Sequence, residues 1–260
     1  MHGRFFMGGK VIFCTVLLLL GFFGCGSQPP GPERLCDLAA NGVERAGSLH
    51  FILSHDIGST EITDNMWLLR AEGDVEKPDR LRSTLLVLHR KAERKLQLIS
   101  SGGRIWINDR LGDSRWQPLR DVRSSDILDF EEIPQALYAI RSPHFGVKTQ
   151  KVNYHYPEPR RMRGKEVYIV EGWLESEDLA PVVPSIAEAG HDVHARLWIG
   201  VGDRRLHRLT LTGPLNPDEA QDTQRVLVLS NYNNAPVEIA RSPSNNAKPD
   251  VPHAPKAPTG

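Results

Sequence analysis

The sequence predicts an α+β protein whose core is a largely antiparallel sheet of about ten strands. Short segments with partly alternating apolar residues recur along the chain, and few stretches with helical spacing interrupt them. Charged or glycine-containing turns separate most of these segments, and antiparallel neighbours need only a few linking residues. A sheet of so many twisted strands has to curl, so we expect strong curvature.

The predicted strands fall into two groups along the chain, with a helical region between them. The first group covers residues 49–53, 65–73, 80–90, 95–100 and 103–108, and the second covers residues 147–156, 165–175, 194–201, 205–212 and 224–232. Helical spacing predicts an amphipathic helix from Glu33 to Gly47, a turn at Asp126 to Phe130 continued by Pro134 to Ile140, and a helix at about Glu177 to Ala189. Some strands are apolar on both faces, which fits either central strands or a sheet with helices on one face and a ligand on the other.

The first 24 residues are organised like an export signal. Arg4 and Lys10 precede an apolar run from Val11 to Gly24, and no acidic residue occurs before Glu33. As a helix this run would span about 21 Å, which is short of the roughly 30 Å of hydrocarbon in a bilayer. A cleaved signal therefore fits better than a membrane-spanning anchor.

The end of the signal, Phe22-Phe23-Gly24-Cys25, resembles a bacterial lipobox. In that case Cys25 takes a diacylglyceryl group and becomes the first residue of the mature protein; the alternative is an ordinary signal peptide with an incidental Cys25. Gly, Ser and Pro dominate the next residues, as in a flexible tether. We expect a signal peptide at 1–24, a lipidated tether at 25–33, a folded domain at 34–240 and a disordered tail at 241–260.

Composition excludes several classes of function. The chain has 32 basic and 32 acidic residues without a basic block, which argues against nucleic-acid binding. Of the three cysteines, Cys14 leaves with the signal and Cys25 would be acylated, so Cys36 has no intramolecular disulfide partner. We expect Cys36 to be a small buried residue of the first helix, the alternative being a reactive or intermolecular thiol.

Motifs for catalysis are missing from the sequence. There is no G-x-S-x-G, Walker or H-E-x-x-H pattern, and no cofactor, metal or catalytic residue is predicted. His191 and His194 are three residues apart, but the strand pattern there would place them on opposite faces. The tryptophans are expected to pack in the core, with a ligand-lining role as the alternative. We therefore expect a protein that is not an enzyme.

Several strand and turn segments carry a family resemblance. They are AGSLHFIL after the first helix, GGRIWIND followed by WQPL, the helix start SDIL, GKEVYIVEG, and ARLWIGVGDRRLHRLTLTG before RVLVLSNYN. From Ala46 to Ile239 this arrangement resembles the LppX/LprA/LprF/LprG-type bacterial lipoproteins, which are LolA-like half-barrel lipid carriers. The chain departs from the family in its basic stretches, Arg90 to Arg94 and Pro157 to Arg163, which could narrow a cavity mouth or bind lipid headgroups.

The resemblance implies a half-barrel with helices across its concave face and an apolar cavity for acyl chains. It implies a cell-envelope lipoprotein on the extracytoplasmic side of the membrane, anchored through acyl groups such as palmitate on Cys25. Such a protein transports or presents a lipid or glycolipid, with an envelope transporter as a candidate partner. The alternative is a regulatory or structural lipoprotein that binds another protein. Alternation and helical spacing select the expected lining: Ile105, Ile107, Ile133, Leu137, Ile140, Leu197, Ile199, Val201, Leu209 and Leu211.

Overall fold

The computed structural model describes residues 30–63, 65–109, 116–119, 130–141, 159–183, 187 and 190–234. The predicted signal peptide, Cys25, the tail at 241–260 and the strand at 147–156 lie outside these residues, as does the turn at Asp126 except for Phe130.

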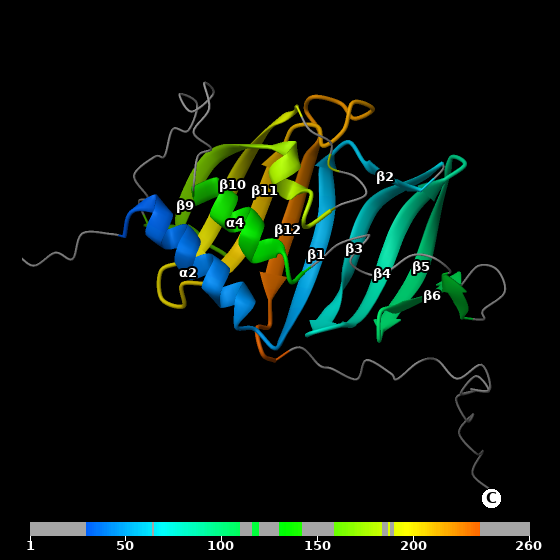
Figure 1. Cartoon of the computed structure of the whole chain (residues 1–260), viewed down its shortest axis with the longest axis horizontal. Coiled ribbons are helices and arrows are strands. Elements are labelled where there is room, and N and C mark those ends of the chain that lie inside the picture. The colour runs from blue at the N-terminus through cyan, green and yellow to red at the C-terminus, as the bar shows by residue number, and fades with distance from the viewer. Residues whose placement is uncertain are drawn as a thin grey trace, which may run out of the picture. The chain divides into compact units, whose positions relative to one another are not determined.

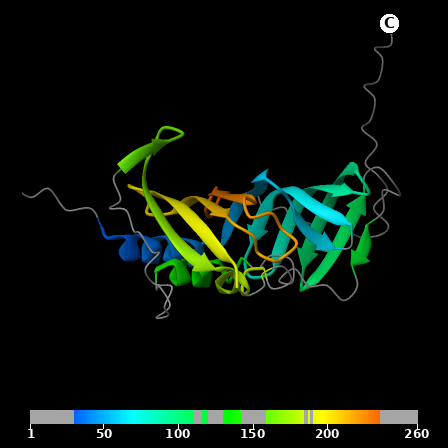
Figure 2. The same ribbon diagram turned by 90° about the horizontal axis from the view of Figure 1, so that it is seen from above.

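The sheet is antiparallel and contains 12 strands (Figure 1). Its strands are β1 (Ser48–Ile57), β2 (Thr60–Thr63), β3 (Met66–Glu76), β4 (Arg80–His89), β5 (Ala92–Ser101), β6 (Arg104–Asp109), β7 (Gln117–Leu119), β8 (Pro159–Met162), β9 (Lys165–Glu175), β10 (Asp192–Gly200), β11 (Leu206–Thr212) and β12 (Gln224–Ser230). This confirms the predicted α+β class and the curved, largely antiparallel sheet (Figure 2). The sequence analysis missed β2, β7 and β8, which are only three or four residues long.

Two meanders meet at the first strand. The strand order is β7-β6-β5-β4-β3-β1-β12-β11-β10-β9-β8, and β2 pairs with β3 at the side of this path. Strand β1 therefore joins its neighbour β3 to the last strand, with Phe51 opposite Leu229. This long-range pairing makes one continuous sheet out of two groups of strands that each form from local hairpins.

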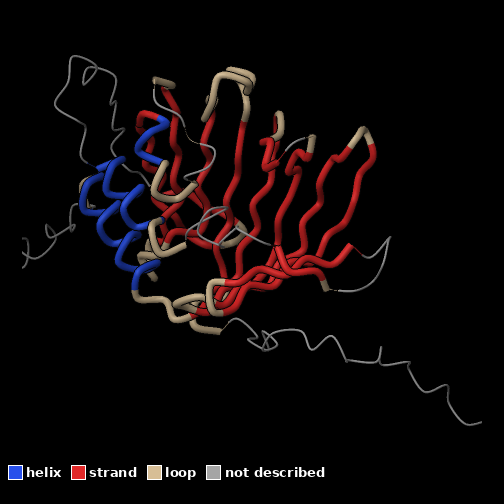
Figure 3. Tube along the Cα trace, turned by 45° about the vertical axis from the view of Figure 1, so that its right-hand side comes forward, coloured by secondary structure: helices blue, strands red, loops and turns tan. Residues whose placement is uncertain are grey.

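Two helices cover one face of the sheet. Helix α2 (Pro32–Glu44) has proline in its first turn, and α4 (Ile133–Arg141) begins one residue before Pro134; both positions suit proline because the first helical N–H groups have no partner within the helix. The two helices pack on each other, and between them they contact β9 and β11 (Figures 1 and 3). Their apolar side chains, including the buried Cys36, close the core, as predicted for that residue.

We call the helix-covered face of the sheet the concave face and the opposite face the convex face. Phe51 points to the concave face, where its ring lies 4.8 Å from that of Phe130 just before α4. Leu49, Val87, Leu197 and Leu229 are also buried on this face. Alternate residues of the same strands, such as His50 and Trp198, point to the convex face.

The predicted helix at Glu177 to Ala189 is wrong in its described part. The structure has only a four-residue 3₁₀ turn, Ser176–Leu179, followed by turns and a bend through Val183. Pro181 and Pro184 explain the difference, because each lacks the N–H that would continue a helical hydrogen-bond ladder. Helical apolar spacing overrode these breakers in the prediction.

Gly73 allows two neighbouring strands to approach closely. A Cβ atom at this position of β3 would lie 2.0 Å from the backbone oxygen of Arg82 on β4. No side chain fits there without moving the backbone of one strand. The glycine thus permits the tight contact between β3 and β4.

Candidate functional site

The predicted lining residues belong to one apolar core. Ile105, Ile133, Leu137, Leu197, Ile199 and Leu209 are buried members of a single hydrophobic cluster, and Ile107, Val201 and Leu211 pack against it. On β10 and β11, Leu197 lies directly opposite Leu209, so their side chains share the concave face. The side chain of Ile140 lies outside the described residues.

The sheet separates these residues into two groups. Ile105 and Ile107 share one face of β6, near one end of the strand order, whereas Leu197, Ile199, Leu209 and Leu211 occupy β10 and β11 near the other end. Ile133 and Leu137 belong to α4, which packs beside β9. Val201 has left β10 and begins the turn to β11. The apolar concave face therefore extends across the sheet. Other apolar side chains of the cluster lie between the residues on β6 and those on β10 and β11.

A buried ion pair interrupts this apolar face at one end of the strands. Arg225 of β12 pairs with Glu219, and their side chains are only 7% and 1% exposed. Arg225 Nε also donates to Thr60 Oγ1 at 3.0 Å, and Nη1 donates to the carbonyl oxygen of Gly213 at 3.0 Å. Glu219 in turn accepts a hydrogen bond of 2.7 Å from the backbone N–H of Leu215. These contacts hold the β11–β12 loop and β2 against the sheet.

His55 stands directly opposite Arg225 in the β1–β12 register. Its Nε2 atom lies 2.9 Å from Thr60 Oγ1. Burial, helped by the positive charge of Arg225, lowers the pKa of His55 from 6.5 to about 4. The imidazole is consequently neutral at pH 7, and the cluster carries only the charges of the Arg225–Glu219 pair.

The convex face carries tryptophan and arginine where core packing was expected. Trp67, Trp106, Trp173 and Trp198 all point to this face, and none of them is buried. The core-packing prediction is wrong for these four because strand alternation places them opposite the apolar face. Arg196 and Arg208 lie over the ring of Trp198, with their guanidinium carbons 5.9 and 4.9 Å from its centroid.

Only His194 of the two histidines lies on a strand, so the expected placement of His191 and His194 on opposite faces of one strand does not apply. His191 precedes β10, and His194 lies on the convex face of β10, where its ring is 4.9 Å from that of the 40% exposed Trp173. Across the described residues no group of three or more His, Cys, Asp or Glu side chains could hold a metal ion. These histidines therefore have aromatic and surface surroundings.

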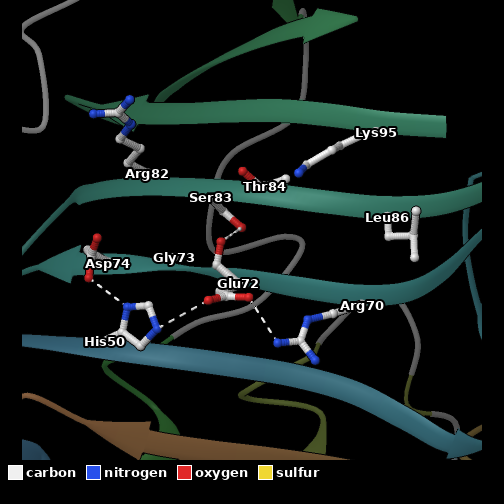
Figure 4. A pocket seen from close by; sticks show the side chains of 10 residues that line it. All are labelled: His50, Arg70, Glu72, Gly73, Asp74, Arg82, Ser83, Thr84, Leu86 and Lys95. Carbon is white, nitrogen blue, oxygen red and sulfur yellow. Dashed lines mark hydrogen bonds and ion pairs between the residues drawn. The ribbon is translucent and has the colours of Figure 1, made fainter. Parts of the chain in front are cut away.

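A polar pocket of about 490 Å³ lies on the convex face (Figure 4). The residues around it come from β1, β3, β4 and β5: His50, Arg70, Glu72, Gly73, Asp74, Arg82, Ser83, Thr84, Leu86 and Lys95. The strand registers bring them together, since His50 pairs with Asp74, Asp74 with Arg82, and Leu86 with Lys95. Charged side chains of both signs thus gather on adjacent strands.

The sequence analysis identified neither the convex pocket nor the buried cluster around Arg225 and Glu219. The convex pocket had a detectable signal: Arg70, Glu72 and Asp74 alternate along one strand, as do Arg82 and Thr84 along the next. The buried cluster had none, because Thr60, Glu219 and Arg225 meet only when β1 pairs with β12.

Comparison with known proteins rests on structure, since no family model and no curated protein matches the sequence. LprF from Mycobacterium bovis aligns with 83% of this chain and 99% of its own, at a TM-score of 0.55 and 14% identity. The chain has the fold of LprF. The lipoprotein LppX from Mycobacterium tuberculosis covers 80% of this chain and 98% of its own, at a TM-score of 0.51 and 14% identity. The resemblance found in the sequence is confirmed for the fold.

Among the described residues no helix is long and apolar enough to cross a bilayer.

Proposed function

We propose that this protein binds the acyl chains of a lipid or glycolipid against its concave face and carries or presents them in the cell envelope. The observation that supports this most is the extended apolar concave face under α2 and α4, on a fold shared with LprF and LppX. Moving acyl chains out of water is favourable by about 0.8 kcal/mol for each buried CH₂. Such a ligand needs apolar area and no reactive group.

Anchoring completes the proposed function. Acylation of Cys25 would hold the domain near the membrane that supplies or receives the lipid, and two or three acyl chains are needed for stable attachment. The mass of the mature N-terminal peptide tests this directly. Replacement of Cys25 by alanine should move the protein from the membrane fraction to the soluble fraction, and retention in the membrane would contradict it.

Extraction of lipid from the purified protein tests the acyl-binding proposal. The protein is purified from its own host, extracted with organic solvent and analysed by native mass spectrometry. We expect acyl species that are lost in Leu137→Trp, which adds bulk to the buried face of α4. The control is Ile169→Trp, the same kind of enlargement on the convex face of β9, which should keep its lipid. A protein that is always free of lipid would refute the proposal.

The second candidate is binding of another envelope protein through the convex face. Exposed Trp173 and the Arg-flanked Trp198 favour it, since tryptophan and arginine are enriched at protein interfaces. A photo-crosslinker at position 173 should then trap one defined partner in the native host, and Trp198→Ala should abolish the crosslink. Lipid-free protein together with this crosslink would favour the second candidate over the first.

A further inference from the structure

The two acidic residues of the convex pocket, Glu72 and Asp74, have their hydrogen-bond and ion-pair partners on β1 and β3. His50 Nδ1 lies 2.8 Å from Asp74 Oδ1, and His50 Nε2 lies 3.7 Å from Glu72 Oε1. Arg70 Nη2 donates to Glu72 Oε2 at 2.9 Å. In Figure 4 the Glu72 carboxylate is directed toward His50 and Arg70. Both carboxylates therefore have partners on β1 and β3.

Two cations remain on the β4 and β5 side of the pocket. Arg82 and Lys95 are exposed, and within the described part of the chain neither makes an ion pair. Arg82 stands opposite Asp74 in the strand register, yet its side chain points away from Asp74 toward β5 in Figure 4. Lys95 extends toward Thr84 from the opposite direction. Two cations thus line this side of the pocket, with Lys95 next to Thr84 and Arg82 farther along β4.

We infer that this pocket binds a phosphate-type oxyanion, either free or in the headgroup of an anionic lipid. Arg82 and Lys95 supply the charge, and the Thr84 hydroxyl beside Lys95 can donate a hydrogen bond to the same ligand. Guanidinium and ammonium groups form short, charge-assisted hydrogen bonds to such oxygens. Arg70 serves the site indirectly, because its charge offsets that of the Glu72 carboxylate, and His50 occupies Asp74 Oδ1.

The size and position of the pocket fit this ligand class. A volume of about 490 Å³ exceeds a bare phosphate and lies within the range of about 300 to 1,000 Å³ for small-molecule sites, so substituents on the phosphate have room. The pocket lies on the opposite face of the same strands from the apolar core, since Asp74 alternates with the buried Val75. Anion binding here is independent of acyl binding on the concave face.

Two probes test the inference on the mature chain with Cys25 replaced by serine, so that acylation cannot itself bring the protein to membranes. Calorimetry measures the binding of inorganic phosphate to the protein. Co-sedimentation measures its binding to phosphatidylcholine vesicles with or without phosphatidylglycerol. We expect Arg82→Gln/Lys95→Gln to weaken binding about tenfold or more, as loss of two charge-assisted hydrogen bonds predicts. Thr84→Val should weaken it less.

The matched control is Arg45→Gln/Lys165→Gln, which removes two exposed cations outside the pocket and should keep binding near the original level. Pocket-dependent binding of inorganic phosphate indicates a free anion, and pocket-dependent binding of phosphatidylglycerol vesicles alone indicates a lipid headgroup. Equal binding by both double variants, or binding to neither probe, would overturn the inference. Acyl content should be unchanged in the pocket variant, so this result is separable from the test of acyl binding.

Discussion

Ion pairs on the concave and convex faces of the sheet differ in how far they are exposed to water. On the concave face the Arg225–Glu219 pair is almost completely buried and has further hydrogen bonds to Thr60, Gly213 and Leu215. On the convex face the Arg196–Glu171 pair, with an N–O distance of 2.6 Å, keeps substantial contact with water. Removing a charge from water is costly, so a buried ion pair needs its opposite charge and further hydrogen-bond partners close by. The concave pair consequently orders a loop, whereas the convex face can leave cations available for a ligand.

The largest expected effect is on the concave pair. Arg225→Met leaves Glu219 buried without its cation, and we expect a loss of about 3 to 5 kcal/mol in the free energy of unfolding, measured by urea denaturation. The double variant Arg225→Met/Glu219→Leu should recover part of this loss, because neither charge is then buried alone. Equal destabilisation by the single and double variants would show that shape rather than charge controls this end of the sheet.

Apolar truncation on the concave face should cost nearly as much. Leu197 is fully buried between β9 and β11, so Leu197→Ala should lower the free energy of unfolding by about 2 to 5 kcal/mol through lost burial and a cavity. The convex control is Ile169→Ala on β9, which is only half-buried and should cost less. Similar losses for the two variants would mean that the convex face packs as tightly as the concave face.

Acid should weaken the fold through His55. Its pKa of about 4 in the folded protein lies below the 6.5 expected when the chain unfolds, so between these values the unfolded chain binds the additional proton. The contribution of neutral His55 to the free energy of unfolding is fully present above pH 6.5. It is lost as the pH falls to about 4, which lowers the free energy of unfolding by up to about 3 kcal/mol. In His55→Gln, the free energy of unfolding from urea denaturation should therefore change less between pH 6.5 and pH 4 than in the original protein.

The convex counterpart of that test is His194. Burial lowers its pKa as well, which gives the same sign of pH dependence. We expect His194→Gln to flatten the profile less than His55→Gln, because His194 lies on the outer face beside Trp173. A larger effect at His194 would contradict the proposed difference in burial between the faces.

The smallest effect is expected at the convex ion pair. Arg196→Gln should change the free energy of unfolding by at most about 1 kcal/mol, since a solvated pair gains little from its charges. Added salt should have little further effect on this variant compared with the original protein. A loss as large as that of Arg225→Met would remove the distinction between the two faces.

Much of the fold could be predicted from local patterns. The observed β9 coincides with the predicted strand at 165–175, and α4 begins one residue before the predicted start at Pro134. The failures have local causes too. Apolar spacing around residue 180 predicts a helix that Pro181 interrupts, and strand tryptophans predicted to be core residues point outward because of strand alternation. Short strands such as β8 have too few residues to show a period.

The sequence by itself determined the α+β class, the antiparallel hairpins and the apolar character of residues such as Leu137 and Leu197, because these follow from neighbouring residues. Only the tertiary structure decided that β1 lies between β3 and β12. That pairing brings His55 and Thr60 to Arg225, and it places His50 beside Asp74 at the convex pocket. Contacts between residues far apart in the chain depend on which strands pair, and local periodicity carries no information about that choice.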